Sequence, residues 1–259
     1  MLFQQKAKKI IRLSATPEGF GQTPDKLTPD MFISELPTQH THEYFQDEEL
    51  GLYVGVWDTT DMIETAGPYP CDEFVWLLEG EAAIRNCKTG EMETVIAGEP
   101  FVIPKGYNCQ WHQAGYLRKF FLISENLNEP MPEMPAFEGI IIPRAAAQMV
   151  PLLTAEPFLT EKNSPIPQHH VCYKDSTGKF LAGTWESDPF ESTEAPFPYH
   201  GFAYVITGSL TLLDEEGVKH SYGPGEALFV PEGLMCNAEA TEKVRLFFAI
   251  LRPGQTERD

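Results

Sequence analysis

The sequence has no apolar run long enough to cross a membrane. No uninterrupted apolar stretch approaches the roughly 20 residues that a membrane-spanning helix requires. The opening segment, MLFQQKAKKIIRLS, is basic, but it lacks the apolar core that defines a signal peptide. We therefore expect a cytoplasmic protein.

Positive charge is also scarce. The chain of 259 residues holds 19 lysines and arginines against 38 aspartates and glutamates, which gives a formal net charge of −19. Nucleic acid and anionic membrane surfaces would be repelled by such a protein. We expect neither of them as a partner.

Cysteine is present in an odd number and without C-x-x-C spacing. The five residues are Cys71, Cys87, Cys109, Cys172 and Cys236. This set indicates neither a disulfide framework nor a zinc ribbon. Reduced thiols are the expectation.

What the sequence does contain is an internal repeat. A shift of 128 residues, reduced to 127 by one deletion, superimposes the second half on the first. Matching pairs include Trp57 with Trp185, Gly80 with Gly208, Gly106 with Gly233 and Cys109 with Cys236. The chain is a tandem duplication.

Each repeat has the pattern of short β-strands joined by turns. Residues 73–84 (EFVWLLEGEAAI) and 202–213 (FAYVITGSLTLL) are apolar runs, rich in branched and aromatic residues and broken by glycine. A proline-rich linker follows the first repeat, and residues 9–14 and 139–144 read as matching opening strands. The pattern predicts two β sandwiches or barrels, with an N-terminal domain over 1–124, a linker over 125–138 and a C-terminal domain over 139–259.

Two motifs resemble those of the cupin superfamily. Glu73 and Gly80 match the end of its first motif, E-x6-G, and two sets of residues match its second, G-x5-P-x-G. Those sets are Gly98, Pro104 and Gly106 in the first repeat and Gly225, Pro231 and Gly233 in the second. The resemblance implies an all-β fold of two tandem cupin barrels, each a double-stranded β-helix or jelly roll.

A narrower resemblance is carried by CDEF (71–74) and PKGYNCQW (104–111). These segments are similar to a cupin subgroup that includes ethanolamine-utilisation cupins and (S)-ureidoglycine aminohydrolase-like proteins. A two-barrel chain of this length also resembles the two-barrel ureidoglycine aminohydrolases, which bind manganese.

Cupin metal sites use two histidines, a glutamate and a third histidine, and mixed ligands of this kind suit Mn, Ni, Fe or Zn. Here only Glu73 remains in the first repeat, and Cys109 stands at the final histidine position. In the second repeat the two positions are Gly201 and Cys236. We therefore expect no metal and favour none of the four. The weak candidates are Glu73, Cys109 and His112, although strand alternation turns His112 away from Cys109.

Several residues are candidates for a ligand site in a barrel mouth. Glu73 is either a catalytic acid or base or a structural acid paired inside the barrel, and we leave both interpretations open. His200 lies one residue before the glutamate position, so it faces the barrel only if a bulge occurs at Gly201. The expected ligand-binding residues are Trp57, Tyr69, Cys109, Trp111, Gln113, Trp185, His200 and Cys236.

Three function hypotheses follow. The first is a homodimeric two-barrel protein that binds a small polar metabolite and has degenerate metal sites. The second is a metal-dependent hydrolase or isomerase that resembles (S)-ureidoglycine aminohydrolase and uses Glu73 with His112 or Cys109. The third is a structural or regulatory protein without a ligand.

Overall fold

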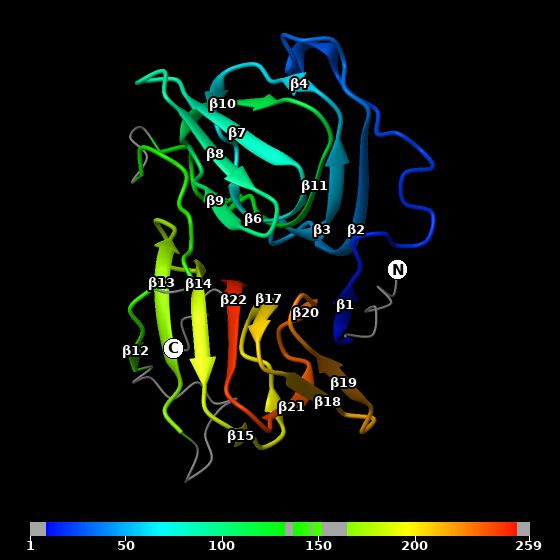
Figure 1. Cartoon of the computed structure of the whole chain (residues 1–259), viewed down its shortest axis with the longest axis vertical. Helices are drawn as coiled ribbons and strands as arrows, with labels where there is room; N and C mark the ends of the chain where they lie inside the picture. Colours follow the sequence, from blue (N-terminus) through cyan, green and yellow to red (C-terminus); the bar gives the residue numbers. More distant parts are fainter. Residues whose placement is uncertain (1–8, 133–136, 146, 152–164, 253–259) are drawn as a thin grey trace. The chain divides into compact units, whose positions relative to one another are not determined.

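The computed structural model describes residues 9–132, 137–145, 147–151 and 165–252 (Figure 1). Within these residues the regular structure consists of β-strands β1–β22 and one turn of 3-10 helix, η1 (Pro29–Met31). No α-helix occurs among them, and none of their helices could cross a membrane. The all-β prediction is confirmed.

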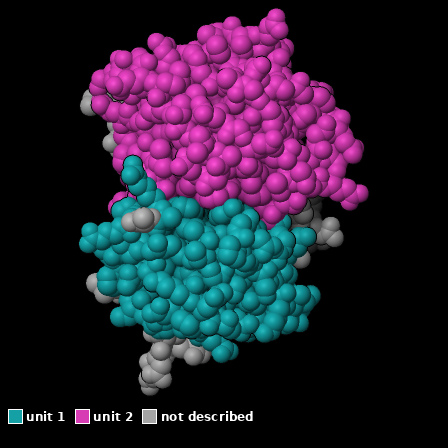
Figure 2. All heavy atoms as spheres, viewed as in Figure 1, with its two compact units in different colours: residues 1–12, 144–171, 181–259 teal, residues 13–143, 172–180 magenta. Residues whose placement is uncertain are grey.

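The chain divides into two compact units (Figure 2). One consists of residues 13–143 and 172–180, and we call it the first barrel. The other consists of residues 1–12, 144–171 and 181–259, and we call it the second barrel.

The first barrel is built from two antiparallel sheets. One has the strand order β2-β3-β11-β6-β9, and the other has the order β4-β10-β7-β8 with β5 also pairing with β10. The strands are β2 (Gln39–Asp47), β3 (Leu52–Thr59), β4 (Met62–Ile63), β5 (Gly67–Pro68), β6 (Asp72–Glu79), β7 (Glu81–Asn86), β8 (Met92–Ile96), β9 (Pro100–Ile103), β10 (Asn108–Gln113) and β11 (Leu117–Ser124).

The second barrel repeats this plan. Its larger sheet has the order β1-β20-β17-β22-β14-β13-β12, and its smaller sheet has the order β15-β21-β18-β19 with β16 also pairing with β21. The strands are β1 (Ile11–Leu13), β12 (Val150–Pro151), β13 (Gln168–Lys174), β14 (Phe180–Ser187), β15 (Phe190–Glu191), β16 (Ala195–Pro196), β17 (His200–Thr207), β18 (Leu210–Asp214), β19 (Lys219–Tyr222), β20 (Ala227–Val230), β21 (Met235–Ala240) and β22 (Val244–Leu251).

The repeat extends to the pairing register of the strands. Lys119 on β11 lies opposite Leu77 on β6, beside an irregularity in the ladder. Leu246 on β22 lies opposite Val205 on β17, beside the same irregularity. Positions related by the sequence repeat are therefore equivalent in the two barrels, which allows their interiors to be compared residue by residue.

The two opening segments are exchanged between the units. β1 pairs with β20, and Ile10 lies in the core of the second barrel. Ile141 forms a β-bridge with Val102, and Ile140 lies in the core of the first barrel. Each opening segment thus completes the core of the barrel that is encoded by the other half of the chain.

Candidate functional site

A buried ion pair occupies the interior of the first barrel. The Lys119 Nζ lies 2.8 Å from Glu73 Oε1, and the two side chains are only 7% and 2% exposed. The two residues come from β11 and β6, which are neighbouring strands of one sheet. Glu73 is thus an inward-facing acid that is paired with an inward-facing cation.

Three aromatic side chains surround this ion pair. The Lys119 Nζ is 4.5 Å from the ring centroids of both Trp57 and Trp111, which is within the range of a cation–π interaction. The Tyr69 hydroxyl donates a hydrogen bond to Glu73 Oε2. Burial and the charge of Glu73 raise the pKa of Tyr69 well above its usual value, so this hydroxyl stays protonated as a donor.

The residues of the first barrel do not fit a cupin metal ion. An ammonium group already compensates the charge of Glu73, the only ligand of the cupin set that remains there. Burial, together with the negative charge of Glu64, raises the pKa of Cys109 to about 12, and a protonated thiol is a poor ligand. The described residues contain no group of three His, Cys, Asp or Glu placed to hold a metal.

His112 and Gln113 make local hydrogen bonds. His112 Nε2 lies 2.7 Å from Gln110 Oε1, while burial and Arg85 lower the pKa of His112. Gln113 Oε1 accepts a hydrogen bond from Trp111 Nε1 at 3.1 Å. Cys109 and Trp111 belong to the core cluster and His112 does not, as the alternation of side chains along β10 predicts.

The first barrel also carries a groove, which we call the first-barrel groove, beside Tyr69 and Cys109. Its titratable lining includes Glu64, Lys105 and Glu125. Burial raises the pKa of Glu64 to about 7, with Lys119 opposing the shift and Glu73 adding to it. Lys105 Nζ donates to the backbone oxygens of Glu125, Asn126 and Glu129, so its charge is already engaged.

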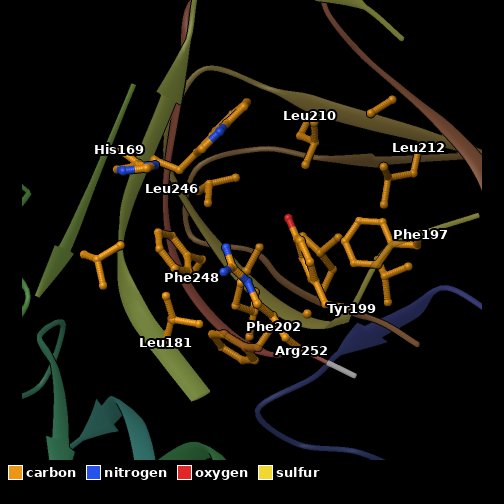
Figure 3. A pocket seen from close by; sticks show the side chains of 18 of the residues that line it. His169, Leu181, Phe197, Tyr199, Phe202, Leu210, Leu212, Leu246, Phe248 and Arg252 are labelled. Carbon is orange, nitrogen blue, oxygen red and sulfur yellow. The ribbon is translucent and has the colours of Figure 1, made fainter. Parts of the chain in front are cut away.

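The interior of the second barrel holds a cavity of about 130 Å³, which we call the second-barrel pocket (Figure 3). Alternate residues of β22 contribute Leu246, Phe248 and Ile250, and Arg252 continues this alternation just beyond the strand. The remaining lining residues are His169, Val171, Leu181, Trp185, Phe190, Phe197, Tyr199, Gly201, Phe202, Ala203, Leu210, Leu212, Leu228, Val230 and Ala238. The lining is therefore mostly aliphatic and aromatic.

The pocket exists because small residues replace large ones at equivalent positions. Gly201 stands where the first barrel has Glu73, and Ala238 stands where it has Trp111. Leu246 replaces Lys119, so the whole ion pair and one of its indole walls are gone. Leu210 in place of Ala82 fills only part of the space that is left.

The polar groups of the second-barrel pocket carry no negative charge. Its ionisable residues are His169, Tyr199 and Arg252, and no Asp or Glu is among the described residues that line it. Tyr199 and Arg252 lie at the same end of the barrel, because Tyr199 directly precedes β17 and the first residue of that strand, His200, pairs with Leu251. Burial, Arg252 and His170 together lower the pKa of His169.

Of the three ligand-binding residues expected in the second barrel, two lie outside the lining of this pocket. His200 is 5% exposed, and its Nδ1 accepts a hydrogen bond from the Glu232 amide at 3.4 Å. The pairing of β17 with β22 is regular from His200 to Val205, so no bulge occurs at Gly201. Cys236 is fully buried in the core cluster, and burial raises its pKa to about 12.

The sites therefore gather only some of the expected residues. Trp57, Tyr69 and Trp111 surround the ion pair of Glu73 with Lys119 in the first barrel. Tyr69 and Cys109 also line the first-barrel groove. Trp185 faces the second-barrel pocket. The remaining functional candidates of this pocket, His169, Tyr199 and Arg252, were not anticipated.

Comparisons with known proteins agree with the observed fold. A family model described as the EutQ-like cupin domain matches residues 174–248. A DUF861-family protein of unknown function from Pseudomonas syringae pv. tomato str. DC3000 has a similar structure, with a TM-score of 0.75 at 22% identity, covering 94% of this chain and all of the other. No curated protein matches.

Two further solved structures share the fold at lower identity. Protein Ylba from E. coli, also of DUF861, has a TM-score of 0.55 at 10% identity and covers 96% of this chain and 93% of its own. A cupin 2 conserved barrel domain protein from Leptotrichia buccalis has a TM-score of 0.54 at 11% identity, with 83% and 89% covered. The chain therefore has the fold of a cupin with two tandem jelly-roll barrels.

Proposed function

We propose that this protein is a metal-independent binding protein whose small-molecule ligand places an apolar group in the second-barrel pocket. The cavity of about 130 Å³ is the observation that supports this function. An apolar cavity of roughly 150 Å³ in another protein is large enough to bind benzene. A ligand with an apolar body of about that size therefore fits better than a wholly polar metabolite.

The described geometry gives less support to the hydrolase alternative. Glu73, its expected acid or base, is engaged by Lys119 and Tyr69 inside the first barrel. Cys109 is a protonated thiol at neutral pH, because its pKa is raised to about 12. The homodimer and the exclusion of nucleic acid and membrane partners stay predictions.

The test is to measure binding of three probes of benzene size, namely benzoate, benzyl alcohol and benzylamine, to the full chain by calorimetry. We expect at least one probe to bind, and EDTA to leave its Kd unchanged. Ala238→Trp restores the indole of the first barrel and fills the cavity, so it should weaken binding at least tenfold. Ala238→Leu fills less of the space and should have a smaller effect.

The matched control is Asn237→Trp on the same strand. Asn237 is more exposed than Ala238 and does not line the pocket, so its replacement should leave the Kd within about twofold of the wild type. Thermal unfolding verifies that each variant is folded. The proposal is wrong if none of the probes binds, or if folded Ala238→Trp and Ala238→Leu bind as tightly as the wild type.

A further inference from the structure

We infer that the ligand of the second-barrel pocket carries a negatively charged head group, as a small aromatic or branched carboxylic acid does, and that Arg252 and His169 recognise it. This inference rests on the proposed function and specifies its ligand class. It follows from the charge of the groups that face the cavity.

The first observation is the sign of the charge in the lining. The protein has a net charge of −19, with twice as many acidic as basic residues. The described lining of this pocket nevertheless contains arginine and histidine and no acidic residue. A positive site in an acidic protein selects an anion and disfavours a cation.

The second observation comes from the repeat. Arg252 occupies the position of Glu125, which lines the first-barrel groove, so the charge at this position is reversed between the barrels. His169 occupies the position of Thr41. At its cavity the second barrel thus has one positive group, Arg252, and one imidazole, in place of the internal ion pair of the first barrel.

The third observation is the placement of the polar groups. Figure 3 shows the nitrogen atoms of Arg252 reaching between Phe248 and Tyr199, and the Tyr199 oxygen pointing into the cavity. Arg252 is exposed at the end of β22, while Phe202 and Leu246 are buried. A guanidinium binds a carboxylate through paired charge-assisted hydrogen bonds, and the Tyr199 hydroxyl can donate another.

The geometry therefore divides the ligand into two parts. The apolar body lies among Leu246, Phe248 and the aromatic rings, where it is removed from water. The carboxylate remains near the end of β22, where Arg252 and Tyr199 meet. His169 contributes from β13, close enough to Arg252 for the guanidinium to affect the pKa of the imidazole.

The experiment compares the same three probes, which share a ring and differ in charge. Benzoate should bind at least tenfold more tightly than benzyl alcohol, and benzylamine should bind more weakly than the alcohol. Arg252→Gln should remove the preference for benzoate over benzyl alcohol. Arg252→Lys should retain part of the preference, and His169→Gln should reduce it less than Arg252→Gln does.

Lys219→Gln is the matched control, because it removes one positive charge from an exposed side chain outside the pocket. It should leave the preference for benzoate unchanged. Equal binding of benzoate and benzyl alcohol, blocked by Ala238→Trp, would overturn this inference and leave the proposed function standing. An unchanged preference in Arg252→Gln, or a loss of it in Lys219→Gln, would also overturn the inference. Failure of all three probes would instead count against the proposed function.

Discussion

The two barrels of this chain share a strand order and a register, yet their interiors are opposite in character. The first is filled by Lys119, Glu73 and two indole rings, and the second is an apolar cavity at the equivalent positions. Three replacements, to Gly201, Ala238 and Leu246, account for most of the difference. The backbone of a cupin barrel therefore does not depend on any one way of filling its centre.

The two barrels also differ in how their interiors accommodate the loss of the cupin metal ligands. In the first barrel the glutamate of the motif remains, and an ammonium group balances its charge. In the second barrel the glutamate is lost, so no buried charge needs a partner and the space becomes a pocket. A buried Glu73 requires a buried cation such as Lys119, whereas Gly201 at the equivalent position requires none and leaves room for a ligand.

The largest expected effect comes from breaking the ion pair of the first barrel. Lys119→Met keeps the length of the side chain but leaves Glu73 buried without its cation, which typically costs about 3–5 kcal/mol of unfolding free energy. Leu246→Met makes the equivalent change in the second barrel and should cost less than about 1.5 kcal/mol. Urea denaturation of the full chain, monitored by tryptophan fluorescence, measures the unfolding free energy of both variants.

A double variant isolates the charge from the packing. Glu73→Gln combined with Lys119→Met removes both charges, so it should be clearly more stable than Lys119→Met alone. If the single and double variants unfold at the same urea concentration, the carboxylate is not what makes the loss of Lys119 costly.

A smaller effect is expected from Glu64, whose position in the second barrel is taken by Ser192. Because its pKa in the folded protein is raised to about 7, ionisation of Glu64 opposes folding as the pH rises from about 5 to 8. Glu64→Gln lacks this ionisation, so its free energy of unfolding should increase relative to that of the wild type as the pH rises. We expect a gain of about 2 kcal/mol at pH 8.

Thermal and urea unfolding at pH 5 and pH 8 test this difference. Glu81→Gln removes a carboxylate from the exposed start of β7 and serves as the control for the loss of one negative charge. A constant difference between Glu64→Gln and the wild type across this range would show that Glu64 titrates normally in the folded state.

The smallest effects are expected at the position where both barrels have a buried cysteine. Cys109→Ala and Cys236→Ala should each cost only about 1 kcal/mol, because each thiol acts as a small buried apolar group. Neither substitution should lower the number of thiols that react quickly with a disulfide reagent in the native protein at pH 7.5. Both should lower the number titrated in urea. Rapid native reaction of either thiol would contradict the interpretation that they are inert.

Much of the fold could be predicted from the sequence, because the duplicated Gly and Pro positions mark the same turns twice. The inward direction of Glu73 and the outward direction of His112 also followed from strand alternation. The partner of Glu73 was harder to predict, since Lys119 is 46 residues away in the chain. Only the pairing of β6 with β11 brings the two side chains together.

The second-barrel pocket was missed for a different reason. The cupin metal motif places Gly201 where a glutamate would stand, which indicates a lost ligand and says nothing of a cavity. The informative property was volume, because Glu73, Trp111 and Lys119 together become Gly201, Ala238 and Leu246. Alternation through RLFFAILR (245–252) indicates which side chains face that space, but not that the space remains empty.

The exchange of the opening segments bears on how this gene product could be shortened. Removing the first thirteen residues would take β1 and Ile10 from the second barrel, whose other strands lie more than a hundred residues downstream. A fragment ending before residue 139 would likewise deprive the first barrel of Ile140 and Ile141. Neither half of the sequence encodes a complete folding unit, and the natural place to divide the chain is not the boundary of its repeat.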